Sequence, residues 1–198
     1  ATRHGTTSVA TMLLAGVALN AFAGAWIGWL TYIADDAQLR SLTTWSLGTL
    51  GGATPRYVPW VVPPALLAAA FLVWQARALD ALSLGEAEAR HLGEDPDRIK
   101  RRVIIGSAIA SGITVGVTGL IGFVGLVVPH VLRLIVGPTH RNLLLLCVIA
   151  GPLLVVASDL LARTVAAPRE VPIGVVMSTV GAPVFLALLL NSRNVSFR

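Results

Sequence analysis

Five long stretches without a charged residue constrain this chain more than any other feature of its sequence. No Asp, Glu, Lys or Arg occurs between Arg3 and Asp35, and four more windows lack charge, namely 57–76, 103–132, 142–158 and 171–192. A helix that crosses a membrane needs about 20 consecutive, largely apolar residues. Because the chain is 55% hydrophobic and only 13% charged, these windows predict a protein that crosses a membrane several times.

The composition excludes the other common classes of chain. A soluble domain carries roughly a quarter charged residues, and a disordered chain combines low hydrophobicity with high charge. The single cysteine, Cys147, excludes a disulfide scaffold. The net charge of +5 is explained by basic residues that face anionic lipid headgroups at the membrane edges, so membrane lipid and not nucleic acid is the expected partner.

The window at 103–132 is too long for one straight crossing. Thirty helical residues would measure about 45 Å, against a hydrocarbon core of about 30 Å. The window holds glycines at regular spacing and then a proline, so we predict structural breaks at Gly119, Gly122, Gly125 and Pro129. The prediction is thus an all-α membrane protein in one domain, with six spans at about 8–33, 57–78, 99–118, 126–137, 141–164 and 172–191.

The distribution of Lys and Arg supports six spans. With a cytoplasmic N-terminus, six spans place 11 of the 15 basic residues inside and 4 outside, whereas five spans give 9 and 6. Cytoplasmic loops carry the excess of positive charge in membrane proteins. The first arrangement is therefore the predicted one.

Two loops are long enough to carry further structure. In the outer loop, Leu39, Leu42, Trp45 and Leu50 have nearly helical spacing and Gly51 follows them, which predicts a short amphipathic helix at 38–50. It is either an interfacial helix anchored by tryptophans or a gate or docking element at the mouth of a cavity.

The inner loop at 79–97 predicts a rigid projection built from two short helices. Leu84, Ala87 and Leu92 can share one helical face, Gly93 is placed to end that helix, and Pro96 fits the first turn of the next. Without further information this loop is either a solvated, charged connection or a docking element.

No catalytic constellation emerges from the residues. The four histidines, His4, His91, His130 and His140, lack metal-ligand spacing with one another or with Cys147. The sequence has neither a nucleophile elbow around Ser158 nor a Walker A loop. We therefore expect no enzyme activity, no metal site and no tightly bound cofactor in this chain.

Several motifs resemble those of the FecCD-type permeases, the membrane subunits of ABC importers for ferric siderophores, haem and cobalamin. The motifs occupy 14–20, 119–134, 137–141, 158–163, 170–176 and 181–186, so the resemblance covers essentially the whole chain. Members of this family have ten membrane helices, and this chain resembles the last six.

The resemblance implies roles for particular residues. Loop 79–97 corresponds to the paired coupling helices that sit in a cleft on the ATPase, with ATPase coupling assigned to Gly85, Glu86, Ala87, Ala89, Leu92 and Gly93. Glu88 stands where the family usually has an alanine. Arg163 and Glu170 correspond to the docking site for a periplasmic binding protein. The periplasmic mouth of the pathway is assigned to Leu42, Trp45, Leu47 and Gly48.

The resemblance also implies partners and a location. These are a second permease copy, two ATP-binding subunits that carry the Mg-ATP, a periplasmic substrate-binding protein and the bacterial inner membrane. The segment 39–54 resembles haem permeases more than cobalamin permeases. Haem is therefore the expected cargo, with a ferric siderophore or cobalamin as alternatives, and a secondary transporter or a membrane enzyme as the competing classes.

Overall fold

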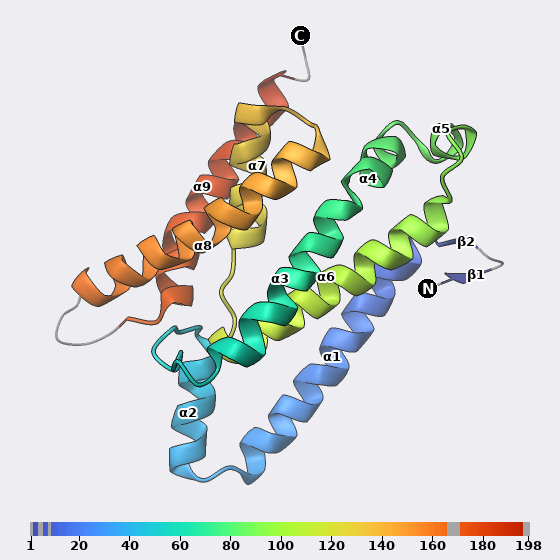
Figure 1. The fold of residues 1–198 in the computed structure, drawn as a ribbon. Helices are drawn as coiled ribbons and strands as arrows, with labels where there is room; N and C mark the ends of the chain where they lie inside the picture. Colours follow the sequence, from blue (N-terminus) through green and yellow to red (C-terminus); the bar gives the residue numbers. More distant parts are fainter. Residues whose placement is uncertain (1, 4–5, 8, 166–170, 196–198) are drawn as a thin grey trace.

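A computed structural model of the chain describes residues 2–3, 6–7, 9–165 and 171–195. Its helices are α1 (Val9–Ile33), α2 (Asp36–Ser46), α3 (Val58–Trp74), α4 (Ala76–Ser83), α5 (Glu86–His91), α6 (Pro96–Thr118), α7 (Val124–Val136), α8 (His140–Val165) and α9 (Ile173–Val195). Two-residue strands β1 (Thr2–Arg3) and β2 (Thr6–Thr7) pair antiparallel before α1. The prediction of an all-α fold is confirmed, with this strand pair as a minor addition (Figure 1).

The long helices form two groups that meet along α8. Helices α7, α8 and α9 pack against one another, α3 packs along α6, and α8 also contacts α3 and α4. Helix α1 lies at the edge of the structure, and its apolar stretch Thr11–Ile33 contains no buried residue (Figure 1). The short helices α2 and α5 lie at opposite ends of the molecule.

Length and hydropathy identify fewer spans than the charge-free windows predict. Within the described residues, Thr11–Ile33 and His140–Val165 are each long and apolar enough to cross a membrane. Helices α3 and α4 qualify together as one bent span, while α7 and Ile173–Ala187 are shorter apolar helices. The structure contains no membrane, so the count of six spans stays a prediction.

Three helix ends differ from the sequence prediction. The predicted span 57–78 is interrupted by a bend of 42° between α3 and α4, at Gln75. The outer helix ends at Ser46 and not at Leu50, because Gly48 adopts φ 76° and the chain turns there. The second short helix of the inner loop is not separate, since the helix that begins at Pro96 continues to Thr118.

Local sequence explains where the short helices begin. Asp35 caps α2, since its Oδ1 accepts from the backbone N of Gln38 at 2.8 Å and the Gln38 Oε1 accepts from the backbone N of Asp35. At the start of α6 the Asp95 Oδ1 accepts from the backbone N of Asp97 and of Arg98, and Pro96 follows as the first helical residue, as predicted.

The buried core lies where α8 and α9 meet the segment between α6 and α7. Ala162, Ile173 and Met177 form its centre, and partly buried side chains such as Ile121 and Val124 pack against them. The hydroxyl of Ser158 lies in this core, where it donates to the backbone O of Leu154 at 2.8 Å and lies 2.9 Å from the Met177 Sδ. This hydroxyl therefore has two partners within the core.

Candidate functional site

One end of the molecule carries a projection that we call the knob, made of α4, α5 and the turn after α5 (residues 76–95). Helix α5 has six residues, and its Ala89 is fully buried, as are Pro96 and Ile99 at the start of α6. Glycines flank α5 on both sides, Gly85 with φ 123° and Gly93 with φ 84°. Gly93 ends the helix as predicted, and the buried alanine makes the knob a rigid element.

The outer surface of the knob exposes apolar side chains beside charged ones. Leu84 and Leu92 are 66% and 64% exposed, and Ala87 is exposed between them. These side chains are therefore accessible to a partner, as the predicted role in ATPase coupling requires. Of the six residues assigned to coupling, only Ala89 is buried, so its role is to hold the knob together.

A charged contact ties α5 to α6. The Lys100 Nζ lies 2.5 Å from the Glu86 Oε1, and the lysine side chain is 14% exposed. The ammonium therefore reaches the knob from α6. Glu86, predicted to face the ATPase, also has this partner within its own chain.

A second contact ties α4 to α8. The Asp80 Oδ1 accepts a hydrogen bond from the backbone N of His140 at 2.8 Å and lies 2.7 Å from the His140 Nδ1. Burial raises the pKa of Asp80, but the backbone and side-chain hydrogen bonds and the charge of His140 outweigh it and hold this pKa below its ordinary value. This pair is not predictable from the sequence, because no local pattern joins residues 60 positions apart.

At the opposite end, three segments meet backbone to backbone in what we call the glycine junction, made of residues 45–49, 116–120 and 173–174. The backbone N of Thr49 donates to the Thr118 O at 2.8 Å, and the backbone N of Ile173 donates to the Gly48 O at 3.0 Å. The Trp45 Nε1 adds a longer bond to the Gly116 O at 3.4 Å. The junction joins the end of α2 to the end of α6 and the start of α9.

Glycine is required in the junction because the backbones approach so closely. A Cβ at Gly119 would overlap the carbonyl oxygen of Trp45, and one at Gly48 would lie 2.6 Å from the Leu120 O. Gly174 has the same constraint against the Leu47 and Leu120 carbonyls. The sequence singled out Gly48 and Gly119 but missed Gly174, because the pattern of the last span does not reveal what it contacts.

Of the other three predicted breaks, Gly122 lies in the non-helical segment between α6 and α7, whereas Gly125 and Pro129 lie inside α7, and for these two the prediction is wrong. Within the window 103–132, the backbone leaves the helical conformation between α6 and α7, where Gly119 has φ 71° and Phe123 has φ 65°. Gly122 would place a Cβ in ordinary contact, 3.9 Å from the Ser178 Oγ, and Gly125 has open space around it. Pro129 lies inside α7, which continues through it.

The residues predicted for the periplasmic mouth surround the junction. Leu42 and Trp45 are half-buried and line a hollow of about 180 Å³ with Ile27 and Leu30 of α1. Leu47 and Gly48 belong to the junction itself. The structure therefore brings all four together at the end of α2 nearest the α6–α7 break.

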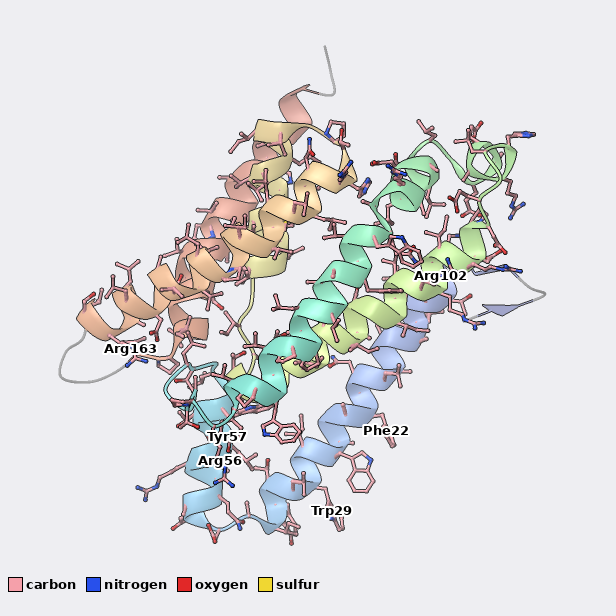
Figure 2. All side chains as sticks on the ribbon, viewed as in Figure 1. Phe22, Trp29, Arg56, Tyr57, Arg102 and Arg163 are labelled. Carbon is pink, nitrogen blue, oxygen red and sulfur yellow. The ribbon has the colours of Figure 1, made fainter. Side chains whose placement is uncertain are left out.

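Arg163 lies at the end of the molecule away from the knob, on the same side as Arg56 and Tyr57 (Figure 2). Its Nε lies 2.8 Å from the Asp159 Oδ2, one helical turn back along α8, and its side chain is 42% exposed. The local pair that competes with a docking role therefore forms. Glu170, the other predicted docking residue, lies outside the described residues.

Two aromatic residues on α1 extend away from the rest of the molecule, Phe22 and Trp29 (Figure 2). Both are 63% exposed, and with Trp26 they line a shallow hollow on the surface of α1. Within the described residues, no group of His, Cys, Asp or Glu could hold a metal ion.

Known proteins resemble this chain along nearly its whole length. A sequence model described as the FecCD transport family matches residues 1–191. The hemin transport system permease protein of Yersinia pestis is 44% identical over 96% of this chain and 57% of its own length. The vitamin B12 import system permease protein of Vibrio vulnificus is 42% identical over 94% of this chain and 56% of its own length.

A solved structure gives the same result. A transporter assigned to the metal-chelate ABC type, in an inward-facing conformation, matches with a TM-score of 0.82 and 31% identity. The match covers 93% of this chain and 60% of that one. The chain thus spans little more than half the length of the curated relatives cited.

Proposed function

Since this chain belongs to the FecCD transport family, we propose that it forms membrane-embedded helices of the permease subunit of an ATP-driven importer. We propose further that haem is the cargo of this importer. The observation that carries the proposal is the family match over residues 1–191, together with a hemin permease that is 44% identical. The subunit itself transports and does not hydrolyse ATP.

The two ends of the molecule fit two different partners. The knob, with its exposed leucines, is suited to a cleft on each of two ATP-binding subunits in the cytoplasm. The opposite end, with α2 and the exposed Arg163, is suited to a periplasmic substrate-binding protein (Figures 1 and 2). For the two ends to meet partners on opposite sides of the membrane, the chain has to belong to a multi-pass protein of the bacterial inner membrane, with the knob in the cytoplasm.

Transport by this mechanism requires helices that move as units without deforming. Closure of the ATP-binding subunits has to move membrane helices as units, because packed helices switch between discrete arrangements and do not deform continuously. The buried Ala89 and the Lys100–Glu86 contact give the knob that rigidity. A second permease copy completes the pathway in this proposal, with α1 nearest the shared axis.

Haem and cobalamin are the leading cargoes. Cobalamin has specific support, because the vitamin B12 permease of Vibrio vulnificus is 42% identical to this chain. Haem is preferred because of the hemin permease at 44% identity and the sequence of the segment 39–54. A ferric siderophore is the third candidate, since the similar solved structure is of the metal-chelate type.

The test is uptake into liposomes that contain the permease with its ATP-binding subunits and binding protein. Haem, cobalamin and a ferric siderophore are supplied separately, with ATP inside. We expect ATP-dependent uptake of haem and not of the other two. Uptake of cobalamin alone would overturn the cargo but keep the transporter class, whereas uptake driven by an ion gradient without ATP would overturn the class.

A further inference from the structure

The contact between Asp80 and His140 connects the knob to a long helix that the proposed function has not yet used. His140 is the first residue of α8, and its backbone N is one of the donors that a helix start leaves without a partner in the helix. The Asp80 carboxylate fills that position and places a negative charge at the positive end of the helix dipole. The side chains of Asp80 and His140 are 37% and 20% exposed, so water screens the contact only in part.

Helix α8 reaches from this contact to the other end of the molecule. It has 26 residues, which at 1.5 Å per residue gives about 39 Å. Near its far end Ala162 is buried against α9, and Arg163 is exposed one residue later. One helix therefore connects the knob to the surface proposed for the binding protein (Figure 1).

We propose that Asp80 is a positioning residue that transmits movement of the knob to α8, so that ATP-driven closure displaces the outer end of α8 at Arg163. This inference rests on the proposed function. Two further charged contacts of the knob, Lys100–Glu86 and Arg98–Asp95, end on α6 and so serve a different helix. Removal of Asp80 leaves the contacts of the knob with α6 in place and removes the hydrogen bonds that join the knob to the start of α8.

The experiment measures the movement directly in the reconstituted importer. Spin labels replace Tyr32 at the outer end of α1 and Leu160 near the outer end of α8, both exposed, in a background with Cys147→Ser. Their distance is measured without nucleotide and with ATP trapped, and binding-protein-stimulated ATP hydrolysis is measured on the same samples. The variants are Asp80→Ala and Asp80→Asn, and the control is Arg98→Gln, which removes an exposed ion pair with Asp95 in the same loop.

We expect Asp80→Ala to bind the ATP-binding subunits normally but to lose the ATP-dependent distance change. Its stimulated hydrolysis falls at least about fivefold, the lower end of coupling between distant sites. Arg98→Gln behaves as the unsubstituted protein. A purely structural role of Asp80 lowers the melting temperature but leaves the distance change intact in assembled complexes, and that result would overturn the proposal.

A second variant covers the case in which Asp80→Ala does not assemble. Asp80→Asn keeps an acceptor oxygen for the His140 backbone N but loses the charge, so it retains at most half of the distance change. If Asp80→Asn keeps the full ATP-dependent distance change, the proposal is overturned. The proposal is also overturned if α8 bends at Gly151 and Pro152, in the middle of the helix, so that the movement does not reach its outer end. The proposed function fails separately, if the unsubstituted protein shows neither ATP-dependent movement nor stimulated hydrolysis.

Discussion

Substitution of Gly119 by alanine tests whether the glycine junction holds the outer end of the molecule together. Gly119 has φ 71° and ψ −164°, a conformation that only glycine adopts readily. The added Cβ would also overlap the Trp45 carbonyl oxygen, a backbone atom that cannot rotate away. The segment 45–49 therefore has to shift.

The structure gives the expected size of the effect. The backbone conformation alone costs about 1–3 kcal/mol for a residue with a side chain. A shift of 45–49 weakens the bonds of Thr49 to Thr118 and of Trp45 to Gly116, at about 1 kcal/mol each. The sum is about 3–5 kcal/mol, which corresponds to a fall in melting temperature on the order of 10 °C for a chain of this size.

The assay is thermal unfolding of the purified protein in detergent, followed by the loss of monodisperse protein. The matched control is Gly125→Ala in α7, where a Cβ meets nothing within 4 Å and alanine favours the helix by about 1 kcal/mol. We expect the control to melt at or slightly above the unsubstituted protein. The melting temperature of Gly119→Ala could instead lie within about 2 °C of that of the unsubstituted protein, a much smaller shift than the conformational cost implies. In that case the glycine junction does not contribute the stability assigned to it.

Three further changes have defined outcomes. Arg163→Glu removes the exposed ion pair between Arg163 and Asp159, so the free energy of unfolding falls by only a few tenths of a kcal/mol. The association rate of an acidic binding protein, measured by stopped flow, falls about tenfold and depends less on salt. Glu86→Arg places a like charge beside Lys100, so it lowers stimulated ATP hydrolysis without preventing membrane insertion, and Lys100→Glu in the same protein restores part of it. Gly174→Ala lowers the melting temperature as Gly119→Ala does, because its Cβ lies 2.9 Å from the Leu120 O.

The sequence was most informative where one property repeats along one element. The absence of charge between Arg3 and Asp35 and between Arg141 and Asp159 marks the interior of α1 and most of α8, because apolar length is a property of the segment itself. Helix starts could be predicted from capping residues for the same reason, and the start of α6 at Pro96 is an example. Both signals lie within one continuous segment of the chain and need no contact with a distant segment.

The candidate sites were readable only in part, because their geometry depends on contacts between distant segments. Regular glycine spacing pointed equally to Gly119, Gly122 and Gly125, but only Gly119 lies against another backbone. Its partner is the carbonyl of Trp45, more than 70 residues earlier, and no periodicity encodes that approach. The bend at Gln75 was missed because its neighbours on both sides are ordinary helix formers.

The two ends of α8 differ in what the sequence could say of them, and that difference explains why its role as a connecting element was not apparent. At Arg163 the partner Asp159 lies one turn away, so a local pair could be anticipated from spacing. At His140 the partner is on another helix, and only the fold brings the Asp80 carboxylate to the helix start. A helix whose start depends on a residue of the knob cannot keep its position when the knob moves, unless that contact breaks. In the mechanism we propose, the Asp80–His140 contact therefore makes the start of α8 follow the knob.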